Sequence, residues 1–271
     1  MKKLYCFTLD DNIRFFEDAC QAGCTSIFDA PYLGMLKRCH DRFGCKFQLN
    51  MFYSYEPDSF SLADVPDCYR QELKSNSDWL KFSFHARHND PPFPYETDDV
   101  SLLEDYLDVL RELIRIAGVE SVAKTTTLHY AAATQAGCKL LQRFGVQGFI
   151  GMFYDKAGKE GLHYYLPPSK WDSLRRGTFY TDPETNLLFA HNDIILNQKD
   201  RDAVIQTLKG LDTLIVQNEH THFVQLMTHE QYFYPDYINY QSDFEEKMTI
   251  ALEFLQRNGY HSIFLEESCP L

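Results

Sequence analysis

The strongest constraint on the fold of this chain is a regular alternation of short β-prone runs and helical patterns along its whole length. Strands that alternate with helices favour parallel pairing, because the helix carries the chain back to the end of the sheet where the next strand begins. About seven such units predict an α/β fold, a distorted (β/α)7 TIM-like barrel. A doubly wound open sheet is the alternative. We expect strands at residues 4–9, 45–53, 79–84, 121–128, 148–153, 213–216, 223–227 and 262–265.

Helical spacing and end signals predict where the helices lie. Glycines follow three of the apolar patterns as stops, at Gly23, Gly44 and Gly118. Ser242 and Glu245 predict a capping box at the start of the last helix. Residues 154–190 lack periodicity, which predicts an insertion within a single domain that spans 1–271. The expected helices are 12–22, 31–44, 68–73, 103–117, 131–144, 200–208 and 242–256.

Composition excludes several classes of partner. The formal net charge of −13 argues against nucleic acid, whose phosphates need clustered lysine and arginine. No run approaches the ~18 apolar residues of a membrane span. The first apolar run, 4–7, is too short for a signal peptide, so we expect a cytoplasmic protein with no membrane partner. The 8 cysteines form no CxxC pair and are interpreted as reduced core residues.

The first predicted strand ends in two adjacent carboxylates, Asp10 and Asp11. Like charges this close disfavour joint ionisation unless a cation or a hydrogen-bonding partner lies beside them. One solution is that one carboxylate holds a metal ion while the other acts as a base. The alternative is that one of them caps the helix that is expected to begin near Asn12.

Three histidines follow other predicted strands: His85, His129 and His229. The carboxyl ends of parallel strands build the active site of an α/β barrel, so these segments and the Asp10-Asp11 pair are expected to converge. Two or three imidazoles beside a carboxylate are typical of a metal site that leaves room for water. A single histidine is more often a core or loop residue that bonds the backbone.

Two of these segments resemble motifs of the polysaccharide deacetylase (NodB-homology) family. Thr8-Leu9-Asp10-Asp11-Asn12 resembles the first motif, Thr-Phe-Asp-Asp-Gly, and Leu226-Met227-Thr228-His229 resembles the late Leu-x-His motif. The resemblance implies that Asp10 is the catalytic base, Asp11 a metal ligand and His229 the general acid. It also implies a distorted barrel of seven units, and that Asp193 corresponds to the aspartate that orients the acid.

A third segment, His85-Ala86-Arg87-His88, resembles the second motif, which supplies two metal-binding histidines. The resemblance implies that His85 and His88 join Asp11 in holding a divalent metal ion, with zinc as the expected metal. The family spaces its two histidines four apart with Ser or Thr after the first, whereas here they are three apart with Ala86 between them. His129 is therefore a rival for the third ligand. It stands where the family has an arginine that supports the base, and no arginine is present there.

The resemblance implies a metal-dependent deacetylase, a hydrolase of C–N bonds other than peptide bonds, with a carbohydrate-like or other small-molecule substrate. Two alternatives remain open. The first is a barrel relative that binds a ligand or partner without turnover, which the missing arginine and the compressed histidine spacing favour. The second is a metal hydrolase of a small amide. The intact Asp10-Asp11 pair and His229 favour an enzyme.

Overall fold

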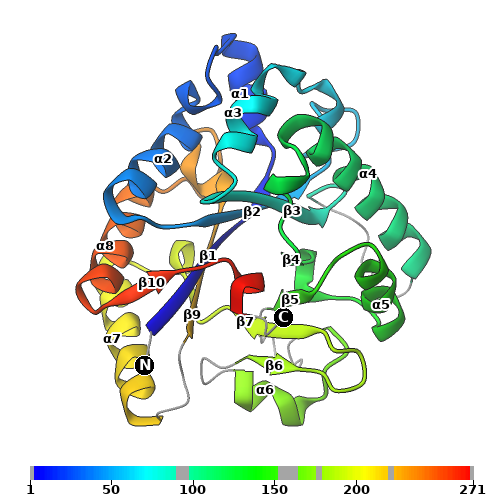
Figure 1. The fold of residues 1–271 in the computed structure, drawn as a ribbon. Helices are drawn as coiled ribbons and strands as arrows, with labels where there is room; N and C mark the ends of the chain where they lie inside the picture. Colours follow the sequence, from blue (N-terminus) through cyan, green and yellow to red (C-terminus); the bar gives the residue numbers. More distant parts are fainter. Residues whose placement is uncertain (1–2, 90–97, 152–163, 175–178, 219–222, 269–271) are drawn as a thin grey trace.

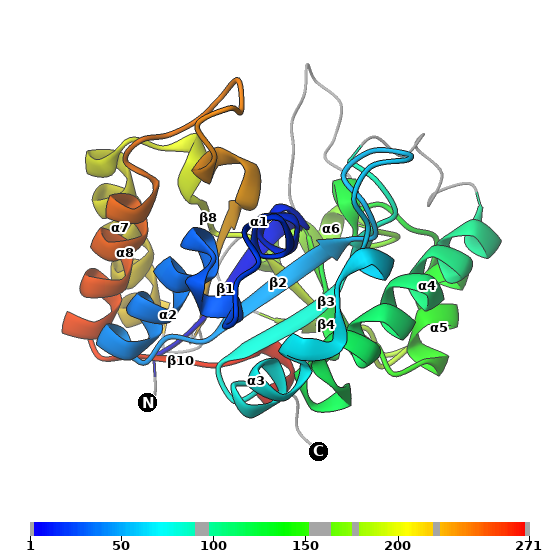
Figure 2. The same cartoon turned by 90° about the horizontal axis from the view of Figure 1, so that it is seen from above.

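The computed structural model describes residues 3–89, 98–151, 164–174, 179–218 and 223–268 (Figures 1 and 2). One sheet has the strand order β3-β2-β1-β9-β8, with β10 paired to the start of β1, and the other has the order β4-β5-β7-β6. The pairs in both sheets are parallel, apart from antiparallel β6 and β7. The strands are β1 (Lys3–Asn12), β2 (Phe47–Phe52), β3 (Leu80–Ala86), β4 (Thr125–Thr126), β5 (Gly148–Gly151), β6 (Tyr180–Thr181), β7 (Leu188–His191), β8 (Ile194–Ile195), β9 (Phe223–His229) and β10 (Tyr260–Ser262).

The two sheets meet at two seams and together form a distorted (β/α) barrel, which confirms the predicted fold class. At one seam a single parallel bridge joins Phe82 of β3 to Val122, just before β4. At the other seam the chain itself passes from β7 into β8 after two residues. Among the described residues, the backbone ladder is not continuous across either seam. This interruption is the distortion of the barrel.

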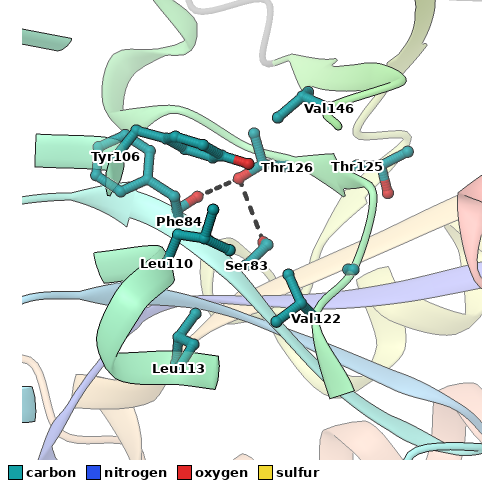
Figure 3. A pocket seen from close by; sticks show the side chains of 10 residues that line it. Ser83, Phe84, Tyr106, Leu110, Leu113, Val122, Thr125, Thr126 and Val146 are labelled. Carbon is teal, nitrogen blue, oxygen red and sulfur yellow. Dashed lines mark hydrogen bonds between the residues drawn. The ribbon is translucent and has the colours of Figure 1, made fainter. Parts of the chain in front are cut away.

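Side chains hold the seam between β3 and β4. The Thr126 hydroxyl donates to the carbonyl of Phe84 and lies 3.2 Å from Ser83 Oγ (Figure 3). A small pocket lies beside these bonds, between the strands and helix α4 (Asp99–Ala117), and most of its wall is apolar. It is lined by Ser83, Phe84, Tyr106, Leu110, Leu113, Val122, Ala123, Thr125, Thr126 and Val146.

Helices cover the outside of the barrel (Figures 1 and 2). Two pairs pack side by side, α7 with α8 and α4 with α5. Gly23 and Gly44 end the first two helices in the left-handed conformation, with φ of 63° and 64°, as the sequence predicts. Within the described residues, no helix combines the length and hydrophobicity that a membrane span requires. The other helices are α1 (Arg14–Ala22), α2 (Pro31–Phe43), α3 (Arg70–Ser75), α5 (Gln135–Arg143), α6 (Pro168–Leu174), α7 (Arg201–Asn218) and α8 (Phe244–Arg257).

Strand β2 is buried on both faces, and the faces differ in chemistry. Phe47, Leu49 and Met51 belong to the main apolar core. The alternate residues, Gln48 and Asn50, are also buried, and Gln48 bonds to Thr125 of β4 across the intervening strand β3. Side chains that reach from β2 past β3 to β4 lie inside the barrel. The barrel interior is therefore polar on this side.

The expected strand at 213–216 is wrong. These residues belong to α7, which runs through Gly210 to Asn218. Val204, Leu208 and Leu211 are buried or partly buried at helical spacing, so the apolar stripe continues past the glycine. That burial outweighs the ~1 kcal/mol by which glycine disfavours a helix.

The expected capping box before the last helix is also wrong. Helix α8 follows Asp243 and has no side-chain cap within the described residues. The Glu245 carboxylate pairs instead with Arg38 at 2.9 Å. Strands β4 and β10 are shorter than expected or displaced, since residues 265–268 form a 3-10 turn. Within the segment 154–190, residues 154–163 and 175–178 lie outside the described residues, as do 152–153 of the expected fifth strand.

Candidate metal centre

A local irregularity at the end of β1 sets the positions of Asp10 and Asp11. The β1–β2 register shifts between Leu9 and Asn12, and Asp11 has a positive φ of 63°, which is uncommon outside glycine. The Asn12 side chain donates to the carbonyls of Leu9 and Asn50, which holds this bulge. Successive residues of a regular strand face opposite sides of the sheet. The bulge instead brings both carboxylates beside histidines.

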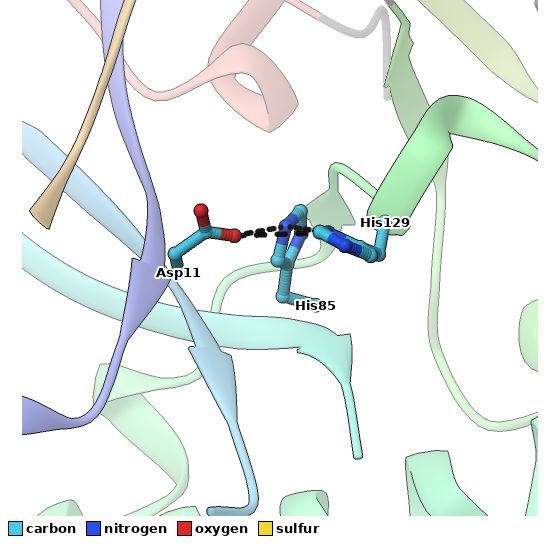
Figure 4. Close-up of side chains that lie close together, drawn as sticks. All are labelled: Asp11, His85 and His129. Atoms are coloured by element: carbon cyan, nitrogen blue, oxygen red, sulfur yellow. Dashed lines mark hydrogen bonds and ion pairs between the residues drawn. The ribbon is translucent and has the colours of Figure 1, made fainter. Parts of the chain in front are cut away.

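Three side chains meet at the strand ends: Asp11 from β1, His85 from β3 and His129 from the turn after β4 (Figure 4). His85 Nε2 lies 3.1 Å from Asp11 Oδ1, and His129 Nδ1 lies 3.6 Å from the same oxygen. The two ring nitrogens are 3.0 Å apart. These candidate ligand atoms lie within 4.8 Å of one another. Tyr130 and Ala131, next to His129, also have positive φ values of 61° and 51°.

The hydrogen bonds around this cluster leave its inner atoms available to a cation. His85 Nδ1 donates to the carbonyl of Thr127, which leaves a lone pair on Nε2. Gln231 Nε2 donates to Asp11 Oδ2 at 2.6 Å, while Oδ1 makes no hydrogen bond to the described residues. Two ring nitrogens 3.0 Å apart and one buried carboxylate oxygen therefore converge, and a proton or a cation must lie between them. This donor set fits zinc or a related divalent ion.

Electrostatics favour the ligand forms of two of these side chains. Burial opposes ionisation of Asp11, but His229, His85 and His129 hold its pKa well below the ordinary value. Burial, together with the nearby His85, lowers the pKa of His129 to about 4, so its imidazole is neutral at pH 7. Burial also acts to lower the pKa of His85, yet Asp10 and Asp11 raise the pKa above its ordinary value. A divalent cation would replace the proton that this acidic pair attracts.

Asp10 and His229 lie opposite each other in the β1–β9 register. Asp10 is 2% exposed, and its Oδ1 accepts a hydrogen bond of 2.5 Å from Asn50 Nδ2. Burial raises the pKa of Asp10, while His85, His229 and Asn50 oppose that rise. His229 Nδ1 lies 3.0 Å from Asn197 Oδ1, an acceptor, so this nitrogen carries the proton and Nε2 is left for other partners.

Neither carboxylate caps helix α1, which removes the alternative role that the sequence allowed them. The helix begins after Ile13, which lacks a side-chain cap of its own. Glu230, directly after β9, accepts the backbone amides of Ile13, Arg14 and Phe15 at 2.7, 3.0 and 2.7 Å. The Glu230 side chain thus satisfies the amides at the start of the helix.

Two predicted site residues lie elsewhere. His88 Nδ1 is 2.9 Å from Ser54 Oγ, and His88 is not part of the described Asp-His-His cluster. Asp193 accepts the backbone amide of Gln225 at 2.8 Å, and its other oxygen lies 3.7 Å from His191 Nδ1. The residue that contacts the His229 ring nitrogen is Asn197. The structure therefore groups His129, rather than His88, with Asp11 and His85.

Several residues of the site could not be found from a motif. Gln231 directly follows Glu230, but Asn197 and Asn50 lie on other elements and meet the site only in three dimensions. The one available signal was the polar alternation of Gln48 and Asn50 within an apolar strand, which is ordinarily interpreted as a solvent face.

The sequence matches no protein-family model and no curated protein. Solved structures do match. A 4-alpha-glucanotransferase from Thermococcus litoralis has a TM-score of 0.59 at 14% identity over 98% of this chain, which spans 40% of that protein. A protein from Mycobacterium smegmatis, provisionally described as a polysaccharide deacetylase, has a TM-score of 0.53 at 12% identity over 98% of this chain and 89% of its own. The polysaccharide deacetylase Bc1974 from Bacillus cereus matches at 0.46 and 10%, over 100% of this chain and 96% of its own. At such low identity, the first two matches show a shared fold alone. The chain therefore shares its fold with the Thermococcus litoralis and Mycobacterium smegmatis proteins at 14% and 12% sequence identity.

Proposed function

We propose that this protein is a metal-dependent hydrolase that removes an acetyl group from an amide or ester of a carbohydrate-like substrate. The observation that carries the proposal is the Asp11–His85–His129 cluster at the carboxyl ends of the strands, whose candidate ligand atoms lie within 4.8 Å of one another. The fold shared with a protein described as a polysaccharide deacetylase supports the class of reaction. It does not identify the substrate.

Asp11 Oδ1, His85 Nε2 and His129 Nδ1 are the atoms proposed to hold the ion. When bound there, a divalent metal supplies Lewis acidity, which polarises a carbonyl and acidifies water. Thr127, through its carbonyl, and Gln231, through its side-chain amide, fix the orientation of His85 and Asp11.

Asp10 is proposed to accept a proton from the attacking water. It is held by Asn50, and it is not needed as a helix cap, because Glu230 takes that role. His229 is proposed to donate a proton from Nε2 to the departing amine or alcohol, since its Nδ1 is committed to Asn197. Tyr232, whose ring centroid lies 5.9 Å from that of His229, forms part of the surroundings of this acid.

The experiment is to measure acetate release from N-acetylated and O-acetylated oligosaccharides and from a small N-acetyl amide, with zinc present and after chelation. We expect zinc-dependent release that falls at least 100-fold in Asp10→Asn, as for loss of a general base. Release from the small amide alone would change the substrate class. No release from any of them, with about one zinc bound, would favour a barrel that binds without turnover.

A further inference from the structure

We propose that Asn50 is a positioning residue for Asp10. A series of buried hydrogen bonds from Thr125 through Gln48 fixes the orientation of the Asn50 amide. Asp10 is buried, and among the described residues its side-chain hydrogen bond comes from a neutral amide. The bond to Oδ1 comes from Asn50 Nδ2, at 2.5 Å, from the neighbouring strand β2. The positioning role rests on the proposed function, whereas the bond itself does not.

The partners of Asn50 allow its amide only one orientation. Its Oδ1 accepts from Gln48 Nε2 at 2.9 Å and from the hydroxyl of Ser83. Gln48 Nε2 can only donate, so the Asn50 atom that it bonds is the oxygen, and the nitrogen must face Asp10. An amide rotated by 180° would set nitrogen against donors and oxygen against a carboxylate. The backbone carbonyl of Asn50 is tied as well, because it accepts from Asn12 at 3.1 Å.

Thr125 fixes the orientation of the Gln48 amide. Gln48 Nε2 donates to the backbone carbonyl of Thr125 at 2.9 Å, and Gln48 Oε1 accepts from the Thr125 hydroxyl at 3.0 Å. A backbone carbonyl only accepts, so the Gln48 amide is fixed, and through it the Asn50 amide. Thr125 Oγ1 also lies 3.2 Å from Glu266 Oε2, and Lys81 pairs with the other oxygen of Glu266 at 2.9 Å.

All the members that connect Thr125 to Asp10 are buried: Gln48 is 3% exposed, and Asn50 and Thr125 are 0% exposed. A buried polar chain is stable only when its members are satisfied, and here the donated bonds run toward the carboxylate. Such an arrangement holds Oδ1 of Asp10 in place by a neutral amide instead of a cation. Its function is to keep the base at the angle needed to reach water.

The test uses two variants of the full-length protein. Asn50→Asp keeps the shape and the oxygen that Gln48 and Ser83 need, but it replaces the amide donor by a second carboxyl beside Asp10, and Asn50→Ala removes the whole amide. For both we expect kcat to fall about 100-fold with KM nearly unchanged, because the base is misplaced while substrate contacts are kept. In Asn50→Ala, zinc affinity should stay close to the parent value, because the Asn50 side chain makes no hydrogen bond to Asp11, His85 or His129. Asn258→Asp is the matched control. It loses an amide bond to Phe254 at a helix end, and its kcat should not change.

A second arm needs neither turnover nor an Asn50 variant. In the amide NMR spectrum of the zinc-free protein, one Nδ2 proton of Asn50 should lie downfield and exchange slowly. In Asp10→Ala this proton should lose both its downfield shift and its slow exchange. If the signal ignores Asp10→Ala, or if folded Asn50→Asp and Asn50→Ala keep the parent kcat, the inference is overturned. If the parent releases no acetate, the proposed function fails separately, and the NMR signal alone confirms or overturns the bond.

Discussion

Replacing His129 by alanine tests the assignment of the third metal ligand, with His88→Ala as its matched control. His129 Nδ1 lies 3.0 Å from His85 Nε2 and 3.6 Å from Asp11 Oδ1. His88 instead lies beside Ser54, with Nδ1 2.9 Å from its hydroxyl. Even residues that only support a ligand typically change metal affinity 10–100-fold, so loss of a ligand should weaken zinc binding by about 100-fold or more. We expect His88→Ala to stay close to the parent.

The expected change in Tm on adding zinc follows from the linkage between zinc binding and unfolding. Zinc at about 100 times its Kd stabilises the folded chain by ~2.7 kcal/mol. For a domain of this size, each kcal/mol moves Tm by roughly 2–4 °C, so the parent should gain about 5–10 °C. After a 100-fold loss of affinity, the same zinc concentration only equals Kd and stabilises by ~0.4 kcal/mol. His129→Ala should then gain about 1 °C.

The assay is thermal unfolding with and without zinc, paired with a calorimetric titration of each variant. Both variants should unfold cooperatively without zinc, which shows that any lost shift reflects binding and not misfolding. The assignment is refuted if His129→Ala keeps the full zinc shift while His88→Ala loses it. If neither the parent nor the variants bind zinc, cobalt or manganese, the metal site itself is refuted.

Three further changes test other parts of the structure. Burial raises the pKa of Glu230 to about 7 from the ordinary 4.5, so the folded chain binds this proton more tightly than the unfolded chain does. The free energy of unfolding should therefore fall as pH rises from about 4.5 to about 7. Glu230→Gln cannot titrate and should flatten that fall in urea unfolding at several pH values; an equally steep slope contradicts the assignment. Asn197→Ala should lower kcat about 10–100-fold with zinc affinity unchanged, because it releases the His229 ring, and unchanged kinetics would argue against it. Phe15→Ala, at a fully buried ring stacked on Phe82, should cost about 3–5 kcal/mol in the free energy of unfolding, and a loss under 1 kcal/mol would contradict the packing.

The sequence predicts the architecture well because its signals are local. Apolar periodicity identifies the long helices, and Gly23 and Gly44 mark their ends because the chain there adopts a positive φ. Gly210 shows the limit of such signals. It interrupts the apolar pattern of the sequence, but a Cβ at this position would meet no atom within 4 Å among the described residues, and burial of Val204 and Leu208 decides the conformation. The presence of a single glycine does not show whether its unfavourable helix propensity or the burial of the neighbouring apolar side chains is larger.

Some residues of the candidate site can likewise be predicted from the sequence, and others cannot. Asp10, Asp11, His85, His129 and His229 lie at or just beyond strand ends, so parallel topology alone predicts that they gather. The choice between His88 and His129 depends on where two turns point after their strands, which sequence spacing does not determine. Asn50, Asn197 and Gln231 act through contacts between residues that are far apart in sequence, each about 30 or more positions from its partner.

The Glu230 cap also has a consequence for how the molecule opens. Glu230 directly follows β9, and its carboxylate accepts the amides of the first three residues after β1. The first turn of α1 cannot fray without releasing the segment that carries His229 and Gln231. The first turn of α1 and the end of β9 should therefore open together, as one cooperative unit. Hydrogen exchange of the amides of Ile13, Arg14 and Phe15 should then report the same opening free energy as the last amides of β9. The start of α1 and the end of β9 are therefore expected to be ordered together or not at all.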